Sequence, residues 1–230
     1  MRTIILLHGA LGFGSDLSIL SHELTKRGVD SRSFTFPGHG WEPFCGNTGI
    51  AGLSDALGRF ISDSGLQKAH LFGYSMGGYI ALYHAATRGT GGNIITLGTK
   101  FSWTKETVLK ETQALNPAVI EAKMPAFAAT LREKHADPEK LLTGTAGMME
   151  EIGKVQFLNS KTFSAILNPV LVCRGDSDRM VTLEESLHAV KAMPNASFHE
   201  IAPARHQLES VDVQMLANTI YNFCSGERNT

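Results

Sequence analysis

Residues 69–88 read AHLFGYSMGGYIALYHAATR and join a short apolar stretch, a serine flanked by glycines, and a helical pattern. The Gly-x-Ser-x-Gly motif at 73–77 lies between a predicted strand (69–72) and a predicted helix (75–88). A serine at so sharp a turn needs very small neighbours, because the backbone there is strained and closely packed. The segment therefore predicts that the hydroxyl of Ser75 projects above the carboxyl edge of a sheet, at the positive end of a helix.

On both sides of this segment the chain alternates between strand and helix patterns. Leucines at helical spacing and a capping box at Thr182 predict helices between strands expected at 3–7, 30–36, 93–97, 170–173 and 196–201. Strands that alternate with helices form parallel sheets covered on both faces. We therefore expect an α/β fold, with a doubly wound, mostly parallel sheet of about six strands.

The alternation stops between residues 99 and 167, where helical patches occur without a clear strand. We expect this segment to form an inserted helical cap, or lid, on a core made of residues 1–98 and 168–230. Pro138, Gly144 and Gly147 are expected to interrupt the cap helices. The apolar cap residues are expected to form either the cap's own core or an acyl-binding pocket: Phe101, Trp103, Met124, Phe127, Met148, Met149 and Phe157.

Composition argues against several functional classes. The 21 Lys and Arg residues against 22 Asp and Glu residues give a net charge of −1, without the positive field that nucleic acid or an anionic membrane surface attracts. Three cysteines far apart in the chain form neither a disulfide framework nor a zinc motif. The apolar run at 4–7 is too short for a signal peptide, and no run approaches a membrane span. A cytoplasmic protein with a small-molecule partner is expected.

Two other segments place reactive groups at the same sheet edge as Ser75. Asp176 and Asp178 follow the buried strand at 170–173, and His206 follows the last strand. After the first strand, the backbone N–H of Ala10 is positioned to form an oxyanion hole with the N–H of Met76. Serine, acid and histidine in this arrangement perform acyl transfer without a metal or an organic cofactor.

The chain resembles the α/β-hydrolase superfamily over nearly its whole length. His8-Gly9, the Pro-Gly-His-Gly loop at 37–40, the serine motif and the order Ser75, Asp178, His206 all match. The resemblance implies a catalytic triad of these three residues, and it favours Asp178 over Asp176, which is more simply a turn residue. Relatives usually carry an antiparallel hairpin before the strand that ends in His-Gly. This sequence has no room for one, so six parallel strands are expected.

The resemblance extends to two reaction types, carboxylesterases with a small lid and MenH-like lyases, which abstract a proton and eliminate pyruvate. Relatives of the lyase type carry arginine directly after the glycines that follow the motif serine, where this chain has Tyr79. In addition, Arg132 is the only arginine between Arg88 and Arg174. Hydrolysis of a small, largely neutral carboxylic ester is therefore the leading hypothesis. The lyase is the alternative, and a ligand-binding module on the same fold is a third. Substrate contacts are expected from Leu11, Tyr74, Trp103, Met148 and Met149.

Overall fold

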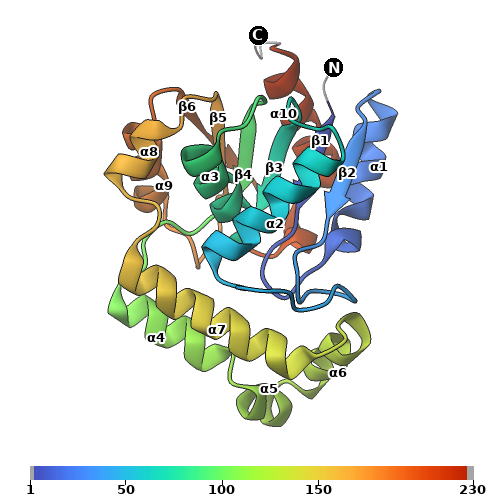
Figure 1. Ribbon diagram of the computed structural model, residues 1–230, viewed down its shortest axis with the longest axis vertical. Coiled ribbons are helices and arrows are strands. Elements are labelled where there is room, and N and C mark those ends of the chain that lie inside the picture. Colours follow the sequence, from blue (N-terminus) through green and yellow to red (C-terminus); the bar gives the residue numbers. More distant parts are fainter. Residues whose placement is uncertain (1–2, 227–230) are drawn as a thin grey trace.

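The computed structural model describes residues 3–226 and contains a sheet of six parallel strands (Figure 1). The strands follow the order β2-β1-β3-β4-β5-β6, so the predicted parallel α/β sheet is confirmed. Residues 1–2 and 227–230, which the sequence assigns to the core, lie outside the described residues. The strands are β1 (Ile4–Leu7), β2 (Ser31–Phe34), β3 (His70–Tyr74), β4 (Ile94–Leu97), β5 (Val170–Gly175) and β6 (Ala196–Ile201).

Helices cover both faces of the sheet, which explains why β1 is an unbroken apolar run. Ile4 and Leu6 pack toward α1 and α10, whereas Ile5 and Leu7 pack toward α2 and α3, and all four side chains are fully buried. The helices of this core are η1 (Gly14–Leu17), α1 (Ser18–Lys26), α2 (Ile50–Asp63), α3 (Met76–Arg88), α9 (Leu183–Ala192), η2 (Leu208–Ser210) and α10 (Val213–Ser225).

Five helices lie between β4 and β5, in the segment expected to form the cap. Pro117, Pro125 and Pro138 each occupy the first turn of a helix, where a missing N–H costs nothing, so these prolines begin helices. The expected interruptions at Gly144 and Gly147 are wrong, because α7 runs through both glycines. The helices are α4 (Lys105–Ala114), α5 (Pro117–Lys123), α6 (Pro125–Lys134), α7 (Pro138–Val155) and α8 (Ser160–Ala165).

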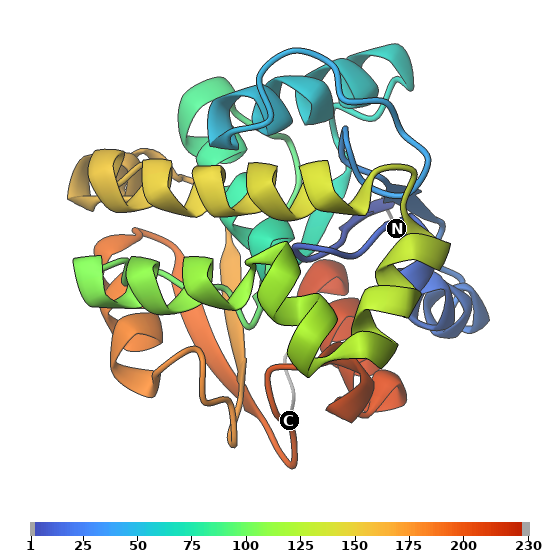
Figure 2. The ribbon, with the colours of Figure 1, turned by 90° about the horizontal axis from the view of Figure 1, so that it is seen from below.

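Helices α4 to α7 form a separate layer at one end of the sheet, with α4 and α7 side by side (Figures 1 and 2). Close approach of this pair depends on Gly153, because a Cβ there would lie 2.5 Å from Cγ2 of Val108. Helix α8 instead packs against α3 and α9. Met124 and Phe127 are 43% and 39% exposed, so neither contributes to a cap core or a pocket as expected.

His135, between α6 and α7, ties this layer to the sheet. Its Nδ1 accepts a hydrogen bond from the N–H of Gly40 at 2.8 Å, and its Nε2 donates to the carbonyl of Leu11 at 3.0 Å. Beside it, the ammonium of Lys134 lies 2.8 Å from the carboxylate of Asp16. Within residues 3–226 no helix is both long enough and apolar enough to cross a bilayer.

Candidate active site

Ser75 occupies the sharp turn between β3 and α3 that its motif predicts. Its backbone has φ +50° and ψ −113°, a strained conformation for a residue with a side chain. A Cβ on Gly73 would collide with the backbone of Gly77 and Gly78, and a Cβ on Gly77 would collide with the carbonyl of Leu7. The motif glycines are therefore required because main chain meets main chain at the turn.

The side chains of Ser75, His206 and Asp178 form a hydrogen-bonded chain. Oγ of Ser75 lies 3.3 Å from Nε2 of His206, and Nδ1 of His206 lies 2.8 Å from Oδ2 of Asp178. Since Asp178 accepts the Nδ1 proton, Nε2 is left free to accept the proton of the serine hydroxyl. Asp176 is not part of this chain, because its Oδ1 accepts from the N–H of Ala204 at 2.8 Å.

The environment of Asp178 keeps its carboxyl group ionised. Burial by itself raises the pKa, but hydrogen bonds from His206 and from the N–H groups of Val181 and Met180 outweigh burial, so the pKa lies below its usual 3.8. The two backbone bonds, at 2.8 Å from Met180 and 2.9 Å from Val181, both reach Oδ1. Within the part of the chain that the structure describes, Oδ2 of Asp178 therefore accepts only the hydrogen bond from the imidazole, and this bond fixes the orientation of the ring.

Tyr74 and Gly98 both lie next to His206. The hydroxyl of Tyr74 donates to the backbone carbonyl of His206 at 3.0 Å, and burial raises the pKa of this phenol, so it remains a donor. Gly98 has φ +61°, and a Cβ at this position would contact the imidazole at 3.4 Å. Glycine is favoured here by the positive φ, since a Cβ contact of 3.4 Å is an ordinary van der Waals distance.

Ala10 and Met76 line the same pocket as Ser75, and Met76 follows Ser75 in the chain. Neither N–H has a hydrogen-bond acceptor among residues 3–226, and Met76 begins α3, whose N-terminus carries partial positive charge. Leu11, next to Ala10, has φ +60°, and its carbonyl is held by His135. Both N–H groups are therefore available to donate hydrogen bonds to a bound group.

His8 stabilises this loop through local hydrogen bonds, as its position after β1 predicts. Its Nε2 accepts from the N–H of Phe36 at 3.0 Å, so Nδ1 carries the proton and donates to the carbonyl of Gly9 at 2.8 Å. Burial holds the pKa of His8 well below 6.5, which keeps the ring neutral. The residue thus joins the end of β1 to Phe36, which follows β2.

A cavity of about 210 Å³ between sheet and cap opens onto Ser75 and His206. Every side chain expected to contact substrate lines it: Leu11, Tyr74, Trp103, Met148 and Met149. Ile152, one helical turn beyond Met148 on α7, also lines the cavity, and its helical spacing from Met148 is the sequence signal that identifies it. Other lining residues without a sequence signal are Ile50, Tyr79, Lys100, Glu111, Ala114, Leu115 and Met180.

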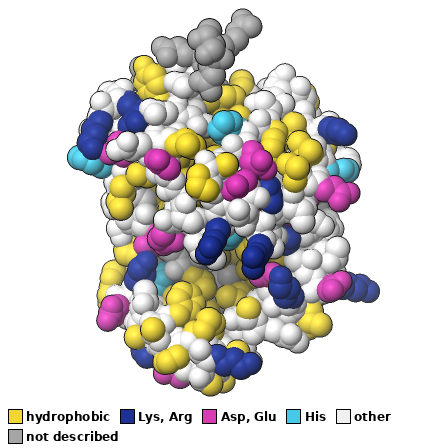
Figure 3. Space-filling model, turned by 180° about the vertical axis from the view of Figure 1, so that it is seen from behind, with side chains coloured by type: hydrophobic (Ala, Val, Ile, Leu, Met, Phe, Trp, Pro, Cys, Tyr) yellow, Lys and Arg dark blue, Asp and Glu magenta, His cyan; other side chains and the backbone are white. Residues whose placement is uncertain are grey.

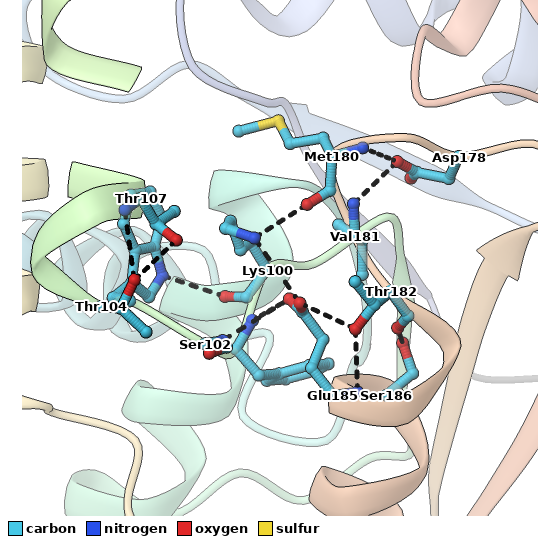
Figure 4. Close-up of polar contacts among 12 residues, drawn as sticks. Lys100, Ser102, Thr104, Thr107, Asp178, Met180, Val181, Thr182, Glu185 and Ser186 are labelled. Atoms are coloured by element: carbon cyan, nitrogen blue, oxygen red, sulfur yellow. Dashed lines mark hydrogen bonds and ion pairs between the residues drawn. The ribbon is translucent and has the colours of Figure 1, made fainter. Parts of the chain in front are cut away.

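Lys100 and Glu185 form a buried ion pair beside the cavity (Figure 4). The Lys100 ammonium donates to the carbonyl of Met180 at 2.8 Å and lies 3.5 Å from Oε2 of Glu185. Oε1 of Glu185 accepts from the N–H of Phe101 at 3.0 Å, while Oε2 accepts from the hydroxyl of Thr182 at 3.1 Å. The pair thus links the connection after β4 to the loop whose N–H groups hold Asp178.

The sequence is similar to that of characterised enzymes over a limited segment. The 2-succinyl-6-hydroxy-2,4-cyclohexadiene-1-carboxylate synthases of Yersinia pestis and Yersinia pseudotuberculosis are 34% identical over 85 residues. That alignment covers 36% of this chain and 29% of the relatives, less than a third of their length.

Similarity to solved structures extends over the whole chain. NosK from Streptomyces actuosus superposes with a TM-score of 0.83 at 19% identity, covering 99% of both chains. An esterase from Thermogutta terrifontis gives 0.76 at 20% identity, covering 100% of this chain and 91% of the other. MenH from S. aureus gives 0.75 at 19% identity, covering 99% and 95%. At these identities the similarity establishes the fold alone.

A family model supplies the assignment that these comparisons leave open. The model of the alpha/beta hydrolase family matches residues 4–215, from the first residue of β1 into α10. The match includes the turn at Ser75 and the loops that carry Asp178 and His206. The chain therefore belongs to the alpha/beta hydrolase family.

Proposed function

We propose that this enzyme is a serine hydrolase that cleaves a small carboxylic ester with an apolar acyl group, through an acyl-enzyme. The observation that carries the proposal is the chain of hydrogen bonds from Ser75 through His206 to Asp178, opening onto a cavity lined mainly by apolar side chains. A serine hydroxyl within hydrogen-bond distance of an imidazole nitrogen, with a carboxylate bound to the other ring nitrogen, is the arrangement that activates serine for acyl transfer.

In the first half of the reaction, Oγ of Ser75 attacks the ester carbon while its proton passes to Nε2 of His206. The negative charge that forms on the carbonyl oxygen is bound by the N–H groups of Ala10 and Met76, each worth about 2.7–4 kcal/mol in the transition state. The bond to the leaving oxygen then breaks, and His206 returns the proton to that oxygen, which departs as an alcohol.

In the second half, water takes the place of the alcohol. Its proton passes to His206 as its oxygen attacks the acyl carbon, and the bond to Oγ breaks. Ser75 regains the proton and the carboxylic acid leaves. The sum is one ester and one water converted to one acid and one alcohol. Throughout, Asp178 remains ionised and stabilises the imidazolium that forms twice per turnover.

A MenH-like lyase is the second candidate, supported by the segment shared with the Yersinia synthases. That reaction needs a clamp for several carboxylates. Arg132, the arginine of the cap segment, is ion-paired with Glu121 and does not line the cavity, and Lys100 is already paired with Glu185. The interior of the cavity therefore suits an apolar acyl group better than a polyanion.

Labelling with a fluorophosphonate, followed by mapping of the modified residue, tests the proposal. We expect modification of Ser75 and burst release of p-nitrophenol from short-chain esters, both abolished in Ser75→Ala. Ser164→Ala, an exposed serine on α8, serves as the matched control and should behave as the wild type. Labelling at another residue would overturn the assignment. Pyruvate release from the lyase substrate without ester turnover would establish the second candidate, and a ligand-induced thermal shift without any turnover would indicate a binding module.

A further inference from the structure

A second, open pocket adjoins the catalytic cavity and shares three residues with it. This pocket has a volume of about 440 Å³ and meets the cavity at Glu111, Met180 and His206. Its remaining lining residues come from α4 and from the loops that follow β5 and β6: Lys110, Ser177, Arg179, Arg205 and Gln207. His206 therefore lines both the cavity and this open pocket.

The open pocket is positively charged, in contrast to the chain as a whole, whose net charge is −1. Lys110 lies 3.7 Å from the carboxylate of Glu111, so these two charges offset each other. Arg179 and Arg205 are exposed, and neither forms an ion pair with a carboxylate among residues 3–226. Figure 3 shows Lys and Arg side chains gathered around the hollow on this face of the molecule.

The position of these two arginines indicates that they contact the leaving group of the substrate. An apolar acyl group bound in the cavity places the ester carbon at Ser75, and the leaving oxygen must lie next to Nε2 of His206, which protonates it. The group attached to that oxygen then lies next to the open pocket, which His206 also lines. Arginine binds carboxylate and phosphate through paired N–H donors, so unpaired guanidinium groups at this point favour an anion.

We propose that Arg179 and Arg205 bind an anionic leaving group, so that the substrate is an ester of an apolar acid with an alcohol that carries a carboxylate or a phosphate. This inference rests on the proposed hydrolase function and specifies its substrate class. It also replaces the largely neutral ester expected from the scarcity of arginine between Arg88 and Arg174. The two cations were not counted in that expectation because they follow the segment in sequence and join the site only through the fold.

Three butyrate esters that differ only in their leaving group test the proposal: phenyl, para-carboxyphenyl and para-phosphonooxyphenyl butyrate. They are compared in the wild type, in Arg179→Gln/Arg205→Gln, and in Arg59→Gln. Arg59 is an exposed arginine on α2 that lines a different pocket, so its variant shows the effect of losing one surface charge away from the site. Comparing variants with wild type for the same ester cancels the intrinsic reactivity of each leaving group.

We expect the double variant to lose about tenfold or more in kcat/KM for the anionic esters, while phenyl butyrate changes by less than about twofold. Added salt should weaken the wild type's preference in the same direction. The ratio between the two anionic esters identifies whether carboxylate or phosphate is preferred. An equal loss for all three esters, or no loss for the anionic pair, would overturn the proposal.

Binding of phenyl phosphate, measured by calorimetry, separates this proposal from the proposed function. If no ester is turned over and Ser75 is not labelled, the hydrolase assignment fails. The anion site is then still supported by phenyl phosphate binding that disappears in Arg179→Gln/Arg205→Gln and persists in Arg59→Gln. Equal binding by all three proteins, or no binding by the wild type, overturns the anion site. Both arginines are exposed, so thermal melting should confirm that the variants fold.

Discussion

Replacing Lys100 with methionine tests how much the buried ion pair with Glu185 contributes to the stability of the fold. The substitution keeps most of the length of the side chain and removes the ammonium group. The side chain of Lys100 is 10% exposed, and that of its partner Glu185 is 7% exposed. The carbonyl of Met180 then loses a charged donor at 2.8 Å, and the buried carboxylate of Glu185 loses its cation.

The expected loss of stability follows from what remains after the change. Removing one member of a buried ion pair costs about 3–5 kcal/mol, because the other charge stays buried. Glu185 retains hydrogen bonds from the N–H of Phe101 and the hydroxyl of Thr182, so we expect the lower end of that range, about 3 kcal/mol. For a chain of this size, that corresponds to a fall in Tm of about 6–12 °C.

Urea denaturation of Lys100→Met, Glu185→Gln and the double variant measures this prediction as a double-mutant cycle. The double variant removes both charges, so its loss should be smaller than the sum of the single losses by about 1 kcal/mol or more. Lys154→Met is the control, since the pair of Lys154 with Glu150 is exposed and should contribute less than about 0.5 kcal/mol. Strict additivity, or a loss below about 1 kcal/mol for Lys100→Met, would refute the reasoning.

Three further outcomes are expected. Ser75→Gly should abolish fluorophosphonate labelling yet raise the free energy of unfolding by about 1 kcal/mol, because φ +50° strains a residue with a side chain; a loss of stability in urea would contradict this. Burial lowers the pKa of His39 to about 4, below the 6.5 expected when unfolded, so the free energy of unfolding should fall by about 3 kcal/mol as pH drops from 6.5 through 4. Urea denaturation at several pH values should show a weaker pH dependence of stability in His39→Gln. An unchanged pH dependence would rule the effect out. His135→Ala removes the bonds to Gly40 and Leu11, so we expect a loss of about 2 kcal/mol and a lower kcat; a wild-type melting curve would exclude this tie between cap and sheet.

The elements whose cause lies within a few residues could be predicted from sequence. The apolar run of β1 reflects burial on both faces, and the hydroxyl of Thr182 accepts from the N–H of Glu185 as its capping box indicates. The glycines around Ser75 predicted a turn with no space for side chains, which the structure has. These signals are readable because each one is a local steric or hydrogen-bonding requirement.

Where packing competes with local preference, the sequence was a weaker guide. Gly144 and Gly147 lower helix propensity by about 1 kcal/mol each, and on that basis a break was expected. Helix α7 continues through them because its buried face, with Leu142, Met148 and Ile152, packs against the rest of the protein. Burial of several large side chains outweighs two unfavourable backbone positions.

Sequence alone determined the parallel sheet and the residue types of the candidate site, since period, motif and order along the chain encode them. Only the tertiary structure decided which charges meet there. Lys100 joins Glu185 across 85 positions, and Arg179 and Arg205 converge beside His206 from two loops. A single charged residue in a loop has no periodic or local signature, so its partner, or its lack of one, is set by how distant segments pack.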